Sequence, residues 1–300
     1  MSSILQPLRA GRFRHVVFSS GSGGRRPVDF TLSQAPRLQP PAQFTRHEAA
    51  FVSELFETAG LDFRAYRIET LHRRLPAALR TLHATSLTHA RQILRQDAGA
   101  RWAALSAMVI GVTSFFRDEP VFDYLTFHAL PSLLGNDKQL RIWSAGCSDG
   151  EELYSVAILL DQLKMLDGAY LLGTDCRHDA IARAREGAYH GSGAKGICAP
   201  WLTQYFEREK DRIRICPRLI SATQWNCADV VSVGEPGCWD MILCRNMGMY
   251  LKPECAGRLW NRFEHQLRPG GYLVLGKAER PVGTTRLSAV APCVYRRDRG

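Results

Sequence analysis

The sequence lacks several features that define other classes of protein. No apolar stretch approaches the roughly 20 residues that a helix needs to cross a bilayer, so we expect a soluble protein without membrane insertion. The nine cysteines are scattered, odd in number and without a C-x-x-C pair, which disfavours both a disulfide framework and a metal site. We therefore expect reduced thiols, a cytoplasmic location and no bound metal.

Lysine is absent from residues 1–112, which carry 15 arginines against seven acidic residues. This basic half is joined to a nearly neutral remainder, which predicts an acidic partner such as nucleic acid, a membrane surface or an acidic protein. A solvated basic face without a partner is the alternative. Residues 1–44 are rich in glycine, serine, proline and arginine, and Asp29 is their single acid, so we predict a disordered tail.

Helical periodicity begins at Thr45 and predicts a mostly helical subdomain and linker over residues 45–134. Its expected helices include one that ends near Gly60, a second with inward-facing leucines over 71–82, and further helical patterns at 87–110 and 119–134. The outer side of the second helix is basic. Its arginines are Arg64, Arg67, Arg73, Arg74 and Arg80.

From residue 135 to the C-terminus, short continuous apolar runs alternate with segments of helix length. Such runs are typical of parallel strands covered on both faces, so we predict a doubly wound α/β sheet with strands at 140–147, 169–175, 239–244 and 271–276. Residues 293–297 are expected to add an antiparallel edge strand. The runs at 213–215 and 219–225 break this alternation and predict a small inserted β hairpin around 207–225.

The stretch RIWSAGCSDGEELYS at 141–155 lacks the third glycine of a dinucleotide-binding fingerprint. Gly146 and Gly150 are four residues apart, and Glu151 and Glu152 occupy the first turn of the following helix. These acids would repel a pyrophosphate but suit a ligand with cationic groups, such as S-adenosylmethionine with its ammonium and sulfonium. The alternative is that the two acids only complement the helix dipole. Asp175 ends the next strand, where a carboxylate can accept hydrogen bonds from both ribose hydroxyls.

The segments that carry a resemblance to a known family are LDFRAYRIETLHRRL (61–75), VTSFFRDEPVFDYL (112–125), IWSAGCSDGEELYS (142–155), LLGTD (171–175), REGAY (185–189), LTQYF (202–206), WN (225–226), CRNMGMYL (244–251) and LRPGGYLVLGKAE (267–279). In this order they resemble segments of the CheR-type methyltransferases, which methylate glutamate side chains of bacterial chemoreceptors. The resemblance runs from about Thr45 onward. The resemblance implies a Rossmann-like class I fold dependent on S-adenosylmethionine, with an N-terminal all-α subdomain and a small inserted β subdomain.

The resemblance also implies roles for individual residues. Glu152 would face the amino-acid end of the cofactor, Asp175 its ribose, and the pair Asn226 and Cys227 its adenine. Arg117 and Tyr250 would lie at the site of methyl transfer. The expected cofactor contacts are Thr113, Arg117, Gly146, Glu152, Asp175, Asn226, Cys227, Asn246 and Met247.

A glutamate carboxylate is ionised at neutral pH, with a pKa near about 4.3, so its methylation needs alignment rather than a general base. Arg117 could grip the carboxylate of either the acceptor or the cofactor, or form a structural ion pair with Asp118 or Glu119. The five arginines of the second helix would attract acidic receptor helices to a monomeric enzyme. Nucleic acid is disfavoured, because the segment after the fourth strand reads RNMGMY (245–250) and lacks an Asn/Asp-Pro-Pro-aromatic turn.

The sequence departs from the family at a few positions. Gly111 replaces a frequent Asn, Asp149 replaces a Thr, and Gly248 replaces a bulky apolar residue next to the expected acceptor pocket, while the inserted hairpin is short. Gly248 could widen that pocket, so methylation of another protein or of a small-molecule carboxylate is an alternative. A non-catalytic module that binds the cofactor or a receptor is a further one.

Overall fold

The computed structural model describes residues 43–109, 111, 113–133, 139–194 and 196–299. All but the last two residues of the predicted N-terminal tail lie outside these ranges. Within the described ranges, no helix is long and apolar enough to cross a membrane.

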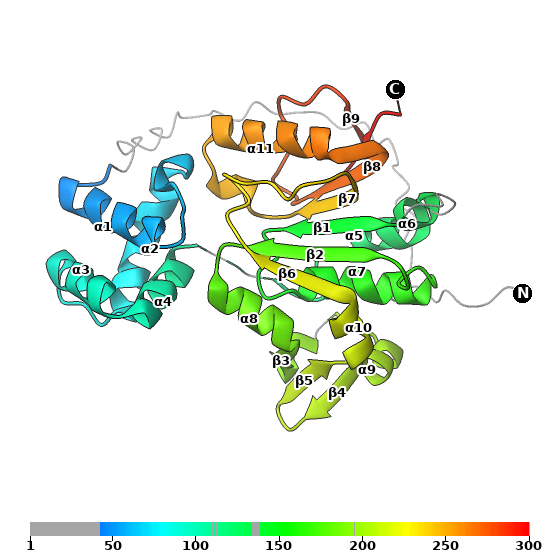
Figure 1. The fold of residues 1–300 in the computed structure, drawn as a ribbon, viewed down its shortest axis with the longest axis horizontal. Helices are drawn as coiled ribbons and strands as arrows, with labels where there is room; N and C mark the ends of the chain where they lie inside the picture. The colour runs from blue at the N-terminus through cyan, green and yellow to red at the C-terminus, as the bar shows by residue number, and fades with distance from the viewer. Residues whose placement is uncertain (1–42, 110, 112, 134–138, 195, 300) are drawn as a thin grey trace, which may run out of the picture.

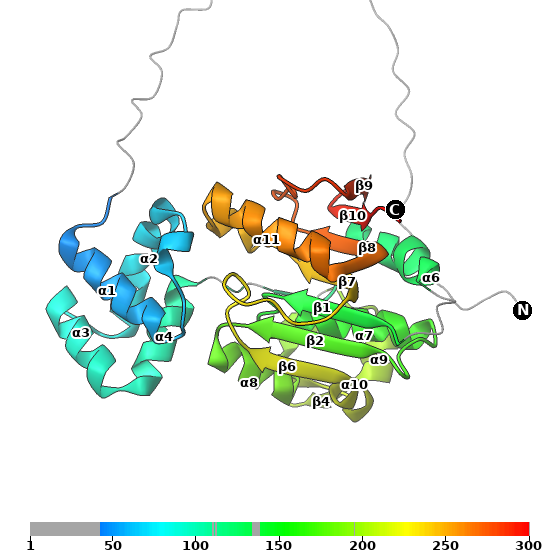
Figure 2. The same ribbon diagram turned by 45° about the horizontal axis from the view of Figure 1, so that its top comes forward.

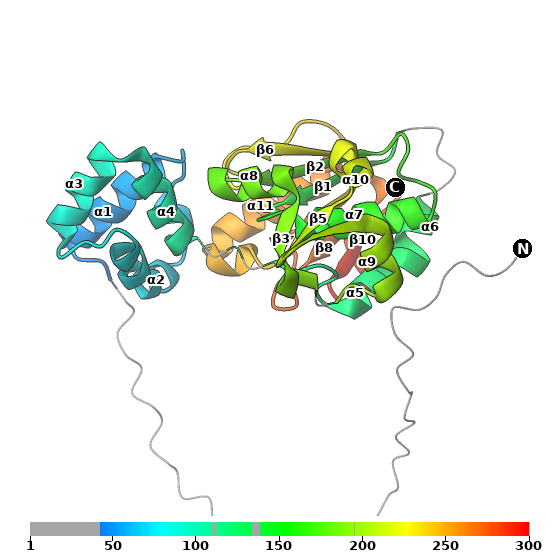
Figure 3. The same ribbon diagram turned by 90° about the horizontal axis from the view of Figure 1, so that it is seen from below.

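Four helices form a bundle at one end of the molecule, apart from the helices that cover the sheet (Figures 1, 2 and 3). Three of them begin at a residue whose side chain caps the helix, namely Thr45, Ser86 and Asp97. Asp97 also ends the preceding helix, so the pattern predicted as one stretch over 87–110 contains two helices. The four are α1 (Arg46–Glu57), α2 (Ile68–Thr81), α3 (Leu87–Gln96) and α4 (Ala98–Met108), with a 3₁₀ turn η1 (Phe63–Ala65) before α2.

The main sheet has seven strands in the order β6-β2-β1-β7-β8-β10-β9. Strands β6, β2, β1, β7 and β8 are parallel, and β10 runs antiparallel between β8 and β9. The predicted parallel strands are confirmed as β1 (Arg141–Ala145), β2 (Tyr170–Asp175), β7 (Trp239–Cys244) and β8 (Leu267–Leu275).

The last strand was expected at the edge of the sheet, and this expectation is wrong. The predicted segment forms β10 (Val294–Arg297), and β9 (Leu287–Ala291) covers its outer side as the true edge. The sequence of β9 is LSAVA, and its side chains are exposed or half-buried. It therefore lacks the continuous apolar run by which the other strands were recognised.

Alternate residues of the strands face two different cores, one on each side of the sheet. Trp143 packs edge-on against Phe263 of α11 (Pro253–Gln266), with ring centroids 5.2 Å apart, whereas its neighbour Ile142 joins the core under α7 (Glu151–Gln162). Helices α11 and α8 (His178–Glu186) lie on opposite sides of the strands (Figure 2).

The helices that follow the bundle belong to the core on the α7 side of the sheet. They are α5 (Glu119–Tyr124), the π-helical turn η2 (Leu125–Ala129) and α6 (Leu130–Ser132). Among the described residues, the separate bundle therefore ends near Met108, well before the end of the helical stretch predicted over 45–134.

A second, three-stranded sheet lies below the main sheet in Figure 1, in the order β3-β5-β4. Its strands are β3 (Ala188–His190), β4 (Phe206–Glu209) and β5 (Arg212–Ile215), with η3 (Gly191–Ala194) and α9 (Ala199–Tyr205) between the first two. The strand predicted at 219–225 as part of this insert is wrong. Pro217 opens a helix, α10 (Pro217–Ala222), and β6 (Thr223–Cys227) then pairs with β2 in the main sheet.

A short antiparallel contact ties the bundle to the loop after β7. Tyr66 forms an isolated bridge with Leu251, the amide of Arg67 donates to the carbonyl of Tyr250 at 2.9 Å, and the amide of Lys252 donates to the carbonyl of Ala65 at 2.8 Å. The Nε of Arg67 also donates to the Leu251 carbonyl, at 2.9 Å. These bonds hold the start of α2 beside the 3₁₀ turn η4 (Gly248–Tyr250).

Candidate active site

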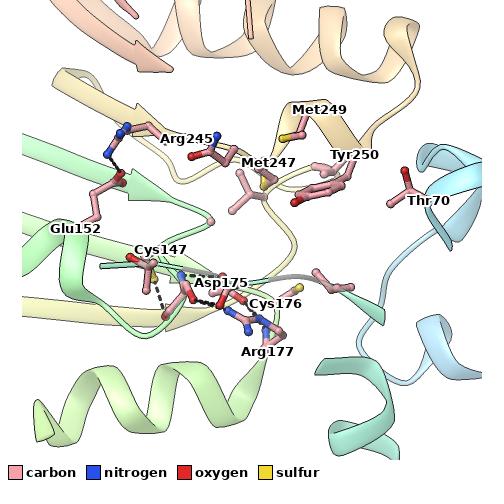
Figure 4. Close-up of a pocket in the computed structure, with 18 of the residues that line it drawn as sticks. Thr70, Cys147, Glu152, Asp175, Cys176, Arg177, Arg245, Met247, Met249 and Tyr250 are labelled. Carbon is pink, nitrogen blue, oxygen red and sulfur yellow. Dashed lines mark hydrogen bonds and ion pairs between the residues drawn. The ribbon is translucent and has the colours of Figure 1, made fainter. Parts of the chain in front are cut away.

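A cavity of about 560 Å³ lies where the carboxyl ends of the parallel strands meet the bundle. This is the edge at which open α/β sheets bind their ligands, and the volume falls within the range of about 300–1,000 Å³ typical of ligand pockets. Figure 4 shows Asp175 and Arg177 on one wall, Met247 and Tyr250 on the opposite wall, and Thr70 of α2 at the bundle end. Predicted site residues that line the cavity are Thr113, Arg117, Gly146, Glu152, Asp175, Asn246, Met247 and Tyr250.

The glycine turn after β1 is shaped by close contacts rather than by a phosphate. Gly146 has φ +77°, and a Cβ there would approach the sulfur of Met247 to 3.0 Å. Gly150 has φ +94°, and its Cβ would lie 2.7 Å from the ring of Trp225. Both glycines therefore allow a left-handed turn that packs against neighbouring elements and brings Met247 next to the end of β1.

Glu152 is the only one of the two adjacent acids that lines the cavity. One of its carboxylate oxygens accepts a hydrogen bond from Ser144 at 2.9 Å, and the other lies 3.3 Å from Nη1 of Arg245. The side chain of Arg245 is 3% exposed and also contacts Asp118 at 2.5 Å. The carboxylate expected to face the ammonium of the cofactor is thus already held in place by an internal cation.

Asp118 has a second cationic partner, because Lys277 Nζ lies 2.5 Å from its other oxygen. Burial of Asp118 would raise its pKa, but the hydrogen bond from Lys277 and the positive charge of Arg245 outweigh burial and lower the pKa. Arg245 additionally donates to the backbone carbonyl of Arg117 at 2.9 Å. This network fixes the segment that carries Arg117 against the start of the loop after β7.

Glu151 does not line the cavity. One of its oxygens is buried without a hydrogen-bond partner among the described residues, and burial raises the pKa of Glu151 to about 7. Asp149 also lies outside the cavity, where it forms an ion pair with Arg183 of α8 at 3.0 Å. Of the three acids in this turn, only Glu152 is therefore placed to contact a ligand.

The second strand ends in a carboxylate that is almost fully buried. One oxygen of Asp175 accepts the amide of Ser148 at 2.9 Å, and the other accepts the amide and the Nε of Arg177 at 3.0 and 3.1 Å. Ser148 and Arg177 line the cavity as well, although neither was predicted from the sequence. Asp175 lines the cavity, and its contact to a ribose stays a prediction.

The pair expected near the adenine does not line the cavity. Cys227 and Asn226 are exposed, and the side-chain amide of Asn226 donates to Glu235 at 2.7 Å. The residues that face the cavity here are the next ones along the chain, Asp229, Val230 and Val231. The strand ends at Cys227, so the loop beyond it, and not the strand itself, reaches the site.

The loop after β7 forms the opposite wall and is organised by a buried carboxylate. Glu279, which is 4% exposed, accepts the backbone amides of Asn246 at 2.9 Å, Gly276 at 2.7 Å and Met249 at 3.1 Å. Asn246 has φ +60°, a conformation that costs energy for a residue with a side chain. We infer that the Glu279 bonds stabilise this turn, which carries Tyr250.

Gly248 does not widen the cavity, in contrast to the expectation from the sequence. It is buried and does not line the cavity, and a Cβ there would lie 2.3 Å from Cζ2 of Trp260 in α11. The space that a bulkier residue would occupy at this position is filled by the indole of Trp260.

The five arginines predicted on one helix are not equivalent, because Arg64 lies in η1 and Arg67 is the N-cap residue before α2. Arg73 and Arg80 are exposed, and Arg64 pairs with Asp62 at 2.9 Å. Arg67 donates to a backbone carbonyl next to Tyr250, as described above. Arg74 is half-buried and lines the cavity, and its Nε has no hydrogen-bond partner in the part of the chain that the structure describes.

The fold and the site define the class of the protein. The parallel sheet, a glycine turn without a pyrophosphate fingerprint and an acid at the end of the second strand are the features of a Rossmann-like methyltransferase that uses S-adenosylmethionine. The cavity and its carboxylates fit that cofactor. The chain belongs to the CheR methyltransferase family, because the family model for the CheR methyltransferase SAM-binding domain matches residues 111–294.

Individual relatives agree with this assignment. The chain is 30% identical over 250 residues to a probable chemotaxis protein methyltransferase of Rhizobium etli, with 77% of this chain and 91% of the relative covered. It is 30% identical over 199 residues to chemotaxis protein methyltransferase 1 of Pseudomonas aeruginosa, covering 63% and 73% of the two chains. Chemotaxis protein methyltransferase of Listeria monocytogenes is 28% identical over 222 residues, covering 74% and 85%.

The solved structures that match the chain are more distant. The plantazolicin methyltransferase BpumL in complex with a triazolic desmethylPZN analog and SAH is 16% identical, the match covers 69% of this chain and 58% of that chain, and the TM-score is 0.33. The family assignment does not depend on this likeness.

Proposed function

We propose that this methyltransferase esterifies glutamate side chains of chemoreceptor proteins. The names of the relatives connect them to chemotaxis. The observation that carries the proposal is that one cavity joins the strand ends, with Asp175 and Glu152, to Thr70 and Arg74 of α2. An acceptor that docks on the bundle can therefore reach a cofactor held at the strand ends.

The chemistry requires little from the protein beyond alignment. When bound, S-adenosylmethionine supplies an electrophilic methyl group and leaves as S-adenosylhomocysteine. The acceptor oxygen forms a bond to the methyl carbon, the carbon–sulfur bond breaks, and its electron pair remains on sulfur. Because a glutamate carboxylate is already ionised at neutral pH, no side chain needs to remove a proton. Proximity and orientation then account for most of the rate enhancement.

The side chains around the cavity have matching roles in this proposal. Arg117 orients the acceptor carboxylate through its guanidinium, and Tyr250 flanks the acceptor from a turn held by Glu279 and by the backbone of Arg67. Asp175 binds the ribose. Thr113, Gly146, Glu152, Asn246 and Met247 complete the proposed contacts to the cofactor.

The docking surface that we propose for acidic receptor helices is narrower than the five arginines considered from the sequence. Arg73 and Arg80 project from α2 into solvent and are seven residues apart, which places them on one side of the helix. Arg74 forms part of the cavity wall, and Arg67 is bonded to the loop after β7. We further propose that the enzyme acts as a monomer in the cytoplasm.

The activity is tested by incubating the protein with methyl-labelled S-adenosylmethionine and cytoplasmic fragments of the host's chemoreceptors. We expect label on the receptor that is released as methanol by mild alkali, because methyl esters hydrolyse under these conditions. A receptor fragment with its candidate glutamates replaced by alanine is the matched control and should stay unlabelled. Cofactor binding without transfer to any receptor fragment would contradict the proposal.

The docking surface is tested by replacing both Arg73 and Arg80 with glutamate. We expect the Michaelis constant for the receptor to rise at least tenfold at low salt, while the affinity for S-adenosylhomocysteine stays unchanged. Exposed Lys164 and Arg286 lie outside α2, and their joint replacement by glutamate gives the same change in net charge. An equal effect of both double variants would show that overall charge, and not α2, attracts the receptor.

A further inference from the structure

The residue at the start of α8 is unusual for its position. Arg177 is the N-cap of α8, and its side chain makes no capping hydrogen bond. Ser, Thr, Asp and Asn are preferred at this position because they accept a hydrogen bond from the first helical turn, and a cation there opposes the helix dipole. Helix stability therefore does not explain an arginine at this position.

Arg177 is instead buried in the cofactor cavity. The residue is 4% exposed, its Nε lies 3.1 Å from the carboxylate of Asp175, and its Nη2 donates to the hydroxyl of Ser148 at 2.8 Å. That hydroxyl in turn donates to the backbone carbonyl of Gly111 at 3.2 Å. The dashed lines of Figure 4 mark the contact between Arg177 and Asp175.

Gly111 provides the space that the guanidinium occupies. A Cβ at this position would lie 2.0 Å from Nη2, 2.3 Å from Cζ and 2.4 Å from Nη1 of Arg177. Any side chain at residue 111 would therefore displace the guanidinium as it lies here. Gly111 stands where the family commonly has asparagine, and the guanidinium of Arg177 occupies the space that the asparagine side chain would need.

The contacts of Arg177 limit what Asp175 can offer to a ligand. A carboxylate has about four acceptor sites, and three of those on Asp175 are taken by the amides of Ser148 and Arg177 and by the Arg177 Nε. The two amide bonds belong to the backbone turn and stay in place. A ribose with two hydroxyls can therefore use both only if the Nε bond is given up.

We propose that Arg177 is an internal competitor of the cofactor ribose for Asp175, and that Gly111 makes this competition possible. The inference rests on the proposed contact between Asp175 and the ribose. The consequence is that this chain binds its cofactor more weakly than it would if the Asp175 carboxylate had no contact with the Arg177 guanidinium. Arg177 thus determines affinity without contacting the reacting atoms.

The proposal is tested by titration calorimetry with S-adenosylhomocysteine as the probe. Arg177→Ser removes the competing guanidinium and supplies a residue able to cap α8, and the new cap offsets part of the stability lost with the buried ion pair. We expect its Kd to fall about tenfold, which corresponds to about 1.4 kcal/mol. Arg185→Ser, an exposed arginine on the same helix that does not line the cavity, is the control and should leave Kd within twofold.

A second variant disturbs the contact between Arg177 and Asp175 by filling the space at residue 111. Gly111→Ala should push the guanidinium off Asp175 and also lower Kd, and it should have no further effect when combined with Arg177→Ser. An unchanged or higher Kd for Arg177→Ser, measured at a temperature where the variant is folded, would overturn the proposal.

The ribose placement is checked separately, because Asp175→Asn should raise Kd at least tenfold. If it does not, the assumed contact is wrong and the inference falls with it. No acceptor is present in these titrations, so a failure of the proposed receptor activity would leave their outcome unaffected.

Discussion

The buried carboxylate of Glu279 offers the sharpest test of how the loop after β7 is held. Glu279→Gln keeps the shape of the side chain but leaves one carbonyl oxygen in place of two charged ones. The oxygen that accepts Asn246 and Gly276 can be replaced by the amide oxygen, and the amide NH₂ then faces the N–H of Met249. One bond is lost and two become neutral rather than charge-assisted.

The expected cost follows from these three contacts. A hydrogen bond to a charged group contributes about 1.5–3 kcal/mol, and a neutral one about half as much. We therefore expect the free energy of unfolding to fall by about 3–6 kcal/mol, measured by urea denaturation. Because Asn246 has φ +60° within this turn, loss of its anchor should also displace Tyr250 and lower kcat at least tenfold at a temperature where the variant is folded.

Glu264 provides a matched control within the same chain. It is 3% exposed, and one of its oxygens accepts the amides of Thr285 and Arg286 at 2.9 and 3.0 Å, outside the cavity. Glu264→Gln keeps both bonds on the amide oxygen, so we expect a smaller loss of stability and an unchanged kcat. If Glu279→Gln lowers stability but keeps kcat within twofold, the carboxylate stabilises the fold without positioning the acceptor loop.

Three further predictions concern residues that the sequence analysis considered as candidates for a role in binding or specificity. Gly248→Ala should destabilise the fold by about 1–3 kcal/mol in urea denaturation by overpacking Trp260, and a stable variant with an altered acceptor range would contradict this. Burial raises the pKa of Glu151 to about 7 from an unfolded value of 4.5, so the ionised carboxylate destabilises the folded state increasingly as pH rises between these values. Glu151→Gln should therefore raise the free energy of unfolding by about 1–3 kcal/mol at pH 8 and barely at pH 5. Asp149→Thr should leave S-adenosylhomocysteine affinity unchanged in calorimetry, because Asp149 pairs with Arg183 outside the cavity.

Local pattern in the sequence was sufficient for most of the architecture. Continuous apolar runs mark buried parallel strands because both faces of such a strand are covered, and β1, β2, β7 and β8 were found in this way. The errors occur where that rule does not apply. Strand β9 is an exposed edge with no continuous run, and residues 217–222 form a helix because proline favours the first helical position.

The site was predictable to the extent that its residues follow strand ends. Asp175 and Glu152 could be selected because the carboxyl ends of parallel strands meet at one edge of the sheet. Asn226 and Cys227 were selected on resemblance, but the chain reaches the cavity only beyond the end of β6, at Asp229. The resemblance to a family, and not the residues alone, supplied the acceptor.

The stretch RIWSAGCSDGEELYS separates what the sequence determines from what only the tertiary structure determines. The sequence by itself determined the strand, the glycine turn and the helix with its acidic start, because each depends on neighbours in the chain. Only the tertiary structure decided that Glu152 meets Arg245, that Asp149 meets Arg183, and that Glu151 is buried without a partner for one oxygen. These partners lie 34 to 93 residues away, so no local pattern records them. Gly111 follows the same rule, since the side chain that fills its space, Arg177, comes from an element distant in the sequence.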